Sequence, residues 1–416
     1  MDISTIGYLD AWFYYFGQEP INMSVLHTIR LLDPVQPEAL TQALQETMTR
    51  FPVLRMGLAV RDNLLCYVEN RGPLPVFPER ETPCLLGSEK TGGYLFRLGY
   101  GVDTITFSFS HGMTDGSGML TIMEMLLDQY FRRVDPAFQG KTYDAVEDRA
   151  EPISLSEDDA SIPEPKLDIY QMPGMVEDFM DANAPQIFMT LSEAALMEQV
   201  RKVHTSPIPY LSALLAHAVH QLYPVGEMPL LFQIPVDFRS RFGVNTCRNF
   251  APAVMLPYAA SLEQLPLEER CAALRAKLRE QVDTRRLRQK LYLAKQEFMS
   301  IPKPVVPPAQ MGRMFHMGMA NTFPASQTAT VSYLRMSFTP EIWKRLRDAR
   351  FYLSFPPYFF VVMAMGNGQV CISTKCAEHS AQLCDAFAQL LRDQGIPLTV
   401  ETERPQFDRL DLERFG

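Results

Sequence analysis

The stretch Thr104-Ile105-Thr106-Phe107-Ser108-Phe109-Ser110-His111-Gly112-Met113-Thr114-Asp115-Gly116 joins an alternating run to a histidine and a tight turn. In residues 104–110 apolar side chains alternate with hydroxyl side chains, which is the pattern of a strand with one polar face. Residues 118–132 then repeat apolar side chains with a helical period. The sequence therefore places His111 in a turn between a strand and a helix, where a side chain can project into a cleft.

His111 is the strongest candidate for chemistry in the chain. It alone, among seven histidines, has Asp-Gly at the fourth and fifth following positions. Imidazole is the side chain best suited to take up a proton near neutral pH. Asp115 either contacts this imidazole or holds the loop, and Gly116 permits backbone shapes that other residues resist. The alternative interpretation is a structural histidine in a loop that precedes a helix.

Composition limits the class of protein. The chain has 416 residues, 47% of them hydrophobic and 21% charged, with a net charge of -9. These values fit a globular protein and disfavour nucleic-acid binding, which requires a basic surface. No membrane span and no signal peptide are expected. The seven scattered cysteines indicate reduced thiols in the cytoplasm, with neither a metal site nor a bound cofactor.

The pattern of predicted strands and helices suggests two similar halves. Residues 1–150 form the first, residues 151–184 are a proline-rich and acidic linker, and residues 185–416 form the second. In the second half we expect a strand over 328–338, a helix over 340–348 and an Asn-Gly hairpin around 366–368. Mixed sheets covered by helices give an α/β (α+β) two-layer sandwich.

The motif at 111–116 resembles the HxxxDG signature of the chloramphenicol acetyltransferase-like superfamily of CoA-dependent acyltransferases. Bacterial alcohol acetyltransferases and condensation-domain-like proteins are the members that it resembles most. Further weak matches follow in the expected order along nearly the whole chain. Residues 40–55 are similar to a helix and strand of the superfamily with the patterns "L..AL" and "P.LR". Residues 191–216 are similar to its helix pair in the middle of the chain. Its segment after the linker is similar to Pro235-Val236-Asp237-Phe238-Arg239 followed by Asn249-Phe250.

The resemblance implies two chloramphenicol acetyltransferase-like halves with a tunnel between them. His111 would act as general base for the attack of a hydroxyl or amine acceptor on a thioester. The donor would be acyl-CoA, and the reaction would proceed in a ternary complex without an acyl-enzyme. Asp115 would then be structural, with Arg239 as its partner in a bidentate pair, and Gly116 would keep the loop tight.

Two positions depart from the pattern of the superfamily. Ser110 stands where condensation domains usually have a second histidine, which disfavours peptide-bond formation. The segment Ser332-Tyr333-Leu334-Arg335 stands where many relatives have Ser-Asn-x-Gly. Ser332 is the candidate donor to the oxyanion, and Ser110, Tyr333 and Arg335 are candidates for lining the tunnel.

Two other functions stay open at this point. The chain is either a catalytically idle scaffold of the superfamily, as the altered 332–335 segment suggests, or an enzyme that takes its acyl group from an acyl carrier protein. A basic run over 275–295 would meet either CoA phosphates or an acidic carrier, or is simply a solvated helix face. The methionine-rich stretch 311–319, with His316, is a candidate lid, and His217 with His220 is a weak candidate metal pair.

Overall fold

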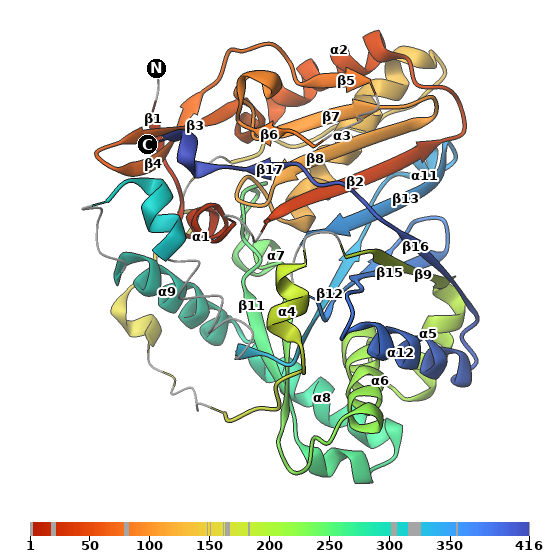
Figure 1. Ribbon diagram of the computed structural model, residues 1–416. Coiled ribbons are helices and arrows are strands. Elements are labelled where there is room, and N and C mark those ends of the chain that lie inside the picture. Colours follow the sequence, from red (N-terminus) through yellow and green to blue (C-terminus); the bar gives the residue numbers. More distant parts are fainter. Residues whose placement is uncertain are drawn as a thin grey trace.

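The computed structural model describes residues 3–17, 22–78, 83–147, 149, 151–160, 162, 167–181, 184–300, 306–314, 326–354 and 357–415. They form two α/β halves that lie one above the other in Figure 1. The predicted two-part α/β architecture is thereby confirmed. The buried apolar residues form two clusters. One combines the upper half with the face of the lower sheet that is turned toward it, and the other lies between the lower sheet and its covering helices.

The sheet of the upper half has five strands in the order β13-β2-β8-β7-β5. Their bounds are Ser24–Leu31 (β2), Val76–Pro78 (β5), Phe96–Tyr100 (β7), Thr104–Ser110 (β8) and Leu346–Leu353 (β13). Ile105, Phe107 and Phe109 of β8 are fully buried in one core with side chains of helices α2 (Pro37–Arg50) and α3 (Gly116–Val134). The hydroxyl side chains of β8 lie on the opposite face of the sheet, as the alternation predicts.

Small elements complete the upper half. A second sheet has the order β1-β4-β3, and β6 pairs in parallel with β17 near the C-terminus. Their bounds, with those of the helices nearby, are Ile3–Thr5 (β1), Tyr8–Phe16 (α1), Pro52–Arg55 (η1), Met56–Arg61 (β3), Leu64–Glu69 (β4), Leu85–Leu86 (β6), Glu89–Thr91 (η2), Arg409–Leu410 (β17) and Leu412–Phe415 (η6).

The sheet of the lower half has seven strands in the order β11-β10-β12-β14-β15-β9-β16. Their bounds are Gln186–Ser192 (β9), Leu230–Pro235 (β10), Ala253–Tyr258 (β11), Ala329–Arg335 (β12), Phe359–Ala364 (β14), Gln369–Lys375 (β15) and Leu398–Glu403 (β16). The predicted Asn-Gly hairpin joins β14 to β15, and Gly368 there adopts the left-handed conformation that its turn requires.

Helices cover one face of the lower sheet and leave the other face toward the upper half (Figure 1). The covering helices are Glu193–Lys202 (α5), Pro207–Leu222 (α6), Leu267–Gln281 (α8) and Ala381–Asp393 (α12). The remaining helices are Glu157–Ala160 (η3), Met175–Met180 (α4), Arg239–Phe242 (α7), Ala260–Gln264 (η4), Thr284–Ser300 (α9) and Pro340–Trp343 (α11). Helices α8 and α9 follow each other along the chain, with one break after Gln281.

The boundary predicted at residue 185 does not divide the chain into two self-contained halves. The helix expected over 340–348 stops at Trp343, and β13 follows and pairs with β2 of the upper sheet. Residues 409–412 also join the upper core. The buried Arg350 of β13 contacts Glu401 and Glu403 of β16, so ion pairs link the two sheets.

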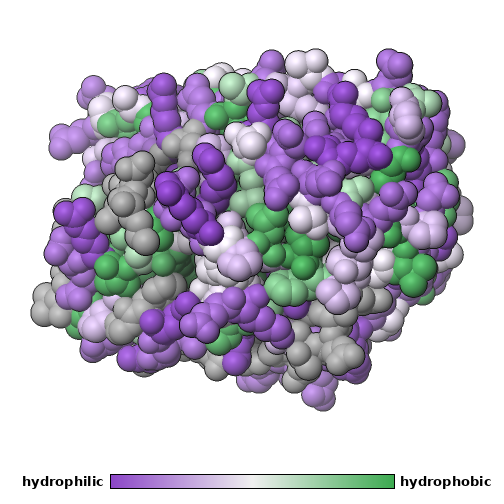
Figure 2. Space-filling model, turned by 90° about the horizontal axis from the view of Figure 1, so that it is seen from above, coloured by the Kyte–Doolittle hydropathy of each residue, from purple (hydrophilic) through white to green (hydrophobic). Residues whose placement is uncertain are grey.

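The surface seen from above the upper half is mostly hydrophilic, with apolar side chains gathered in smaller areas between the hydrophilic ones (Figure 2). Within the described part of the chain no helix is long and apolar enough to cross a membrane.

Candidate active site

His111 follows the last residue of β8 and lies at the border of the two halves. Its backbone N–H donates to the carbonyl of Met23 at 2.8 Å, and its own carbonyl accepts from Asn249 Nδ2 at 2.9 Å. The imidazole stacks on the ring of Phe13 in α1, with 3.9 Å between ring centroids and an angle of 25° between planes. The turn is thus held on both sides of the residue that carries the base.

The surroundings of His111 keep its imidazole neutral. Burial lowers the pKa of this imidazole from its ordinary value of 6.5 to about 4, while the negative charge of Asp115 acts in the opposite direction. A neutral imidazole is the form that can accept a proton. At neutral pH the side chain is therefore ready to act as a base.

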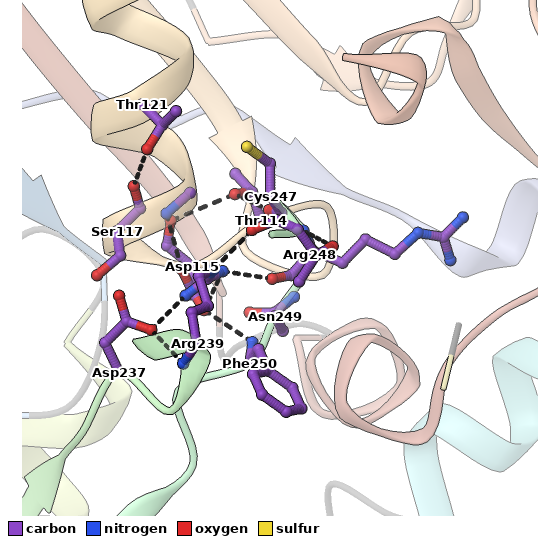
Figure 3. A network of polar contacts seen from close by, with 12 residues as sticks. Thr114, Asp115, Ser117, Thr121, Asp237, Arg239, Cys247, Arg248, Asn249 and Phe250 are labelled. Atoms are coloured by element: carbon purple, nitrogen blue, oxygen red, sulfur yellow. Dashed lines mark hydrogen bonds and ion pairs between the residues drawn. The ribbon is translucent and has the colours of Figure 1, made fainter. Parts of the chain in front are cut away.

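Asp115 is the N-cap of α3 and faces the lower half (Figure 3). One carboxylate oxygen accepts from the Gly118 N–H at 2.9 Å, and the other accepts from the Phe250 N–H at 2.8 Å. Both oxygens also accept from Arg239 Nη2, each at 3.0 Å. The structure thus brings Asp115 and Arg239 together, but one guanidinium nitrogen serves both oxygens, whereas the expected bidentate pair would use two.

Arg239 also holds the segment that follows it. Its Nε donates to the carbonyl of Thr246 at 2.6 Å, and Nη2 donates to the carbonyl of Arg248 at 2.6 Å. Nη1 contacts Asp237 at 3.1 Å. One arginine therefore ties the HxxxDG turn of the upper half to the loop that leads into β11.

Gly116 and Gly118, at the start of α3, lie close to segments of the lower half. A Cβ atom at Gly116 would lie 3.0 Å from Leu334 Cδ1 on β12, and Gly116 does not have a positive φ. We expected an unusual backbone shape at Gly116. The close approach of Leu334 on the neighbouring strand is instead what favours glycine there. A Cβ at Gly118 would lie 2.4 Å from the Cys247 carbonyl oxygen, so this glycine is also fixed by the contact between halves.

The segment 332–335 presents its side chains to two different sides. Leu334 packs with the upper core and against Gly116, whereas Tyr333 packs with the core of the lower half. Because side chains alternate along a strand, Ser332 shares the face of Leu334. Arg335 is exposed and pairs with Glu193 at 2.8 Å. Tyr333 and Arg335 thus lie on the face of β12 that is turned away from Gly116.

Ser110 is buried at the end of β8, on the polar face of the sheet and opposite Ser24 of β2. Its backbone N–H donates to the carbonyl of Leu95 at 3.0 Å. Its location directly before His111 keeps it close to the base.

A buried polar cluster behind His111 was missed by the sequence analysis. It consists of Asp10, Tyr67, Arg248 and Asn249, all less than a tenth exposed. The resemblance to the superfamily includes Asn249 but assigns it no role. The only indication of a role for Asp10 was its position as an acidic residue among the aromatic residues of α1. A small cleft is lined by three of these residues and by Tyr8 and Arg149.

The basic run over 275–295 is largely engaged in ion pairs. Arg286 and Lys277 contact Glu280, whereas Arg288 contacts Asp159 and Lys295 contacts Glu151. The last two pairs fasten α9 to the linker. The run therefore offers less free positive charge than its sequence suggests.

The candidate metal pair, His217 and His220, lies on α6 and not at the His111 turn. His217 contacts Glu263 at 2.8 Å, and burial lowers the pKa of His220. Within the described residues no group of three potential metal ligands occurs. His316 and the end of the methionine-rich stretch lie outside the described residues.

No family model and no curated protein matches the sequence, but many solved structures match the fold. Polyketide synthase associated protein 5 from Mycobacterium tuberculosis is 16% identical, with a TM-score of 0.61 over 93% of this chain and 97% of that one. The condensation domain of the monacolin K polyketide synthase MokA is 12% identical, with a TM-score of 0.64 over 94% and 97%. TRI101 of F. graminearum, complexed with coenzyme A and deoxynivalenol, is 13% identical, with a TM-score of 0.59 over 97% and 100%.

These likenesses cover almost the whole chain and define its class. The chain has the fold of condensation domains and trichothecene acetyltransferases, which is the chloramphenicol acetyltransferase-like fold. The expected resemblance is thus confirmed at the level of fold. Activity is a separate matter, because one fold can carry several functions.

Proposed function

We propose that this chain is an acyltransferase that moves an acyl group from acyl-CoA to the hydroxyl or amine of a small acceptor. The observation that carries the proposal is the place of His111. A neutral imidazole stands at the end of β8, in a turn that Asp115 and Arg239 fasten to the opposite half. The coenzyme A in the TRI101 complex supports the choice of donor.

The chemistry follows from a proton acceptor placed beside a thioester. The acceptor O–H or N–H gives its proton to the unprotonated imidazole nitrogen of His111 while its lone pair attacks the thioester carbonyl. The tetrahedral intermediate then collapses, the C–S bond breaks, and the imidazolium returns the proton to the leaving thiolate. The products are an ester or amide and free CoA, and no acyl group is attached to the protein.

Ser332 is the proposed donor to the oxyanion of the intermediate. It lies on β12 with its side chain on the face that also presents Leu334 to Gly116. Asp115 stabilises the transient imidazolium only through space, because its oxygens already accept from Arg239, Gly118 and Phe250. Its main role in this proposal is to hold the turn.

A thiol-release assay tests the proposal. Free CoA is measured with short and long acyl-CoAs against a mixed pool of alcohols and amines. His111→Ala should lower turnover by about 10²–10⁴-fold, as expected for the loss of a general base. His217→Ala is the matched control, because this histidine lies on α6 and contacts Glu263. Equal turnover in wild type and His111→Ala would refute the role of His111.

The same assay separates the two alternatives. Transfer from acyl carrier protein alone, with none from acyl-CoA, would indicate a carrier-dependent enzyme such as the condensation-domain likeness suggests. The absence of transfer from either donor would favour an idle scaffold. Tyr333 packs with the core of the lower half and Arg335 pairs with Glu193, which supports an enzyme over an idle scaffold.

A further inference from the structure

We propose that Asn249 and Asp10 are positioning residues that fix the His111-Gly112 turn and thereby the direction in which the imidazole points. The proposal rests on the proposed role of His111 as base. Asn249 Nδ2 lies among three oxygen atoms. They are Asp10 Oδ1 at 2.9 Å, the carbonyl of His111 at 2.9 Å and the carbonyl of Gly112 at 3.2 Å.

These three acceptors determine the orientation of the Asn249 amide. An amide turned the other way would place its carbonyl oxygen against three oxygens, which would repel it. In the observed orientation Oδ1 is buried without a hydrogen-bond partner in the described part of the chain. Leaving a buried acceptor unpaired costs free energy, so the side chain is held by what its NH₂ group contacts.

Asp10 holds Asn249 in this place. Its Oδ1 accepts from the backbone N–H of Asn249 at 3.2 Å as well as from the side chain, and its Oδ2 lies 3.6 Å from Arg248 Nη1. Asp10 and Arg248 are 2% and 5% exposed, so their charges are compensated inside the protein. Tyr67 Oη donates to the carbonyl of Gly112 at 3.2 Å from the other side.

Helix α1 thereby acts on His111 at two points. Asp10 acts on its backbone through Asn249, and Phe13, almost one turn further along the helix, stacks on its ring. The backbone N–H of His111 is bound by Met23. With both ends of the residue fixed, the ring has little freedom, and a displacement of about 1 Å at a reacting group can cost about 10²-fold in rate.

Asn249→Ser and Asp10→Asn are the informative substitutions. A serine hydroxyl is too short to reach the oxygens that Nδ2 contacts, so it releases the turn while keeping a small polar side chain. Asp10→Asn keeps the shape of the side chain and removes its charge. It serves as the second variant in case Asn249→Ser folds poorly.

Glu263→Gln is the matched control. Glu263 is a partly buried carboxylate that likewise contacts an arginine, a tyrosine and a third polar side chain. These are Arg270 at 3.2 Å, Tyr258 at 2.5 Å and His217 at 2.8 Å. It follows β11, far along the chain from the turn. A loss of buried polar contacts alone would therefore affect all three variants alike.

The experiment has two readouts on the full chain. NMR follows the ring signal of His111, assigned by its loss in His111→Gln, between pH 3 and pH 8. We expect a midpoint near 4 in wild type and Glu263→Gln, and a higher midpoint in Asn249→Ser and Asp10→Asn, because a loosened turn admits water. The Asn249 side chain itself raises the pKa of His111, so its loss without a loosened turn would lower the midpoint. A midpoint at or below that of wild type in both folded variants would therefore overturn the proposal.

The second readout is thiol release from acyl-CoA. Asn249→Ser should lower kcat by about 10- to 100-fold with KM for the donor within about twofold, as for residues that orient a catalytic group. A kcat within twofold of wild type would also overturn the proposal. If the wild type itself transfers no acyl group, the proposed function fails, and the NMR titration still decides whether Asn249 and Asp10 position His111.

Discussion

Asp115→Asn removes one charge and one hydrogen-bond acceptor from the contact between the two halves and keeps the shape of the side chain. The asparagine side chain has the same shape, and asparagine is a good N-cap, so the contact with Gly118 N–H can persist. One oxygen is replaced by an NH₂ group, which cannot accept from the Phe250 N–H or from Arg239. The substitution therefore tests the ion pair separately from the helix cap.

The magnitude follows from burial. Asp115 and Arg239 are 6% and 13% exposed, and removing one partner of a buried pair costs about 3–5 kcal/mol. Arg239 keeps Asp237 and the carbonyls of Thr246 and Arg248 as partners, so the lower end applies. We expect the free energy of unfolding to fall by about 3 kcal/mol, a large part of the roughly 5–15 kcal/mol typical of folded domains.

Urea denaturation followed by tryptophan fluorescence measures this loss. The two tryptophans of the chain, Trp12 and Trp343, lie in or against the upper core, so they report on the half that carries the turn. Arg239→Gln and the double variant complete a double-mutant cycle. A coupling energy above about 1.5 kcal/mol is expected, whereas single effects that add to within about 0.5 kcal/mol would refute the reasoning.

The remaining predictions concern two histidines and pH. If His111 is the base, kcat/KM should be constant from about pH 5.5 to 8 and should fall with a midpoint near 4, since its imidazole is protonated only below that pH; a midpoint near 6.5 would contradict the burial of the base. His27 on β2 is fully buried, both ring nitrogens lack a partner in the described part of the chain, and burial lowers its pKa to about 3. His27→Leu should therefore raise the free energy of unfolding by about 1–3 kcal/mol at pH 7. Its folded pKa lies below the unfolded value of 6.5, so the unfolded state gains the proton first and stability is lost as the pH falls below 6.5. Wild type should thus lose about 2 kcal/mol more than His27→Leu between pH 7 and pH 5 in urea titrations, and equal losses would show that His27 stays hydrated.

The parts of the fold that depend on neighbours in sequence could be predicted. The strand over 104–110, the turn at His111 and helix α3 follow from short periodic patterns, and the Asn-Gly hairpin follows from its turn residues. Asp115 and Arg239 are 124 residues apart and were paired only through a resemblance. Their contact is present, although periodicity and spacing alone contain no information on it.

The errors arose where distant partners decide the structure. The apolar residues of 340–348 fit a helix, but residues 346–353 pair with β2 more than 300 positions earlier. Tertiary pairing of this kind overrides local preference, and a single sequence does not reveal it. Asp10 was overlooked for the same reason, since its partners Arg248 and Asn249 lie about 240 residues away.

These long-range contacts share one consequence for the proposed chemistry. Thr114 Oγ1 donates to the carbonyl of Cys247 at 2.5 Å, Asp115 binds Arg239, and Asn249 binds the carbonyl of His111, so each part of the turn is held by the lower half. The upper half supplies the base and its contacts with Met23 and Phe13, whereas the lower half supplies the contacts that hold the rest of the turn. A disturbance of the border between the halves should therefore change the orientation of His111, because contacts that fix the turn cross that border.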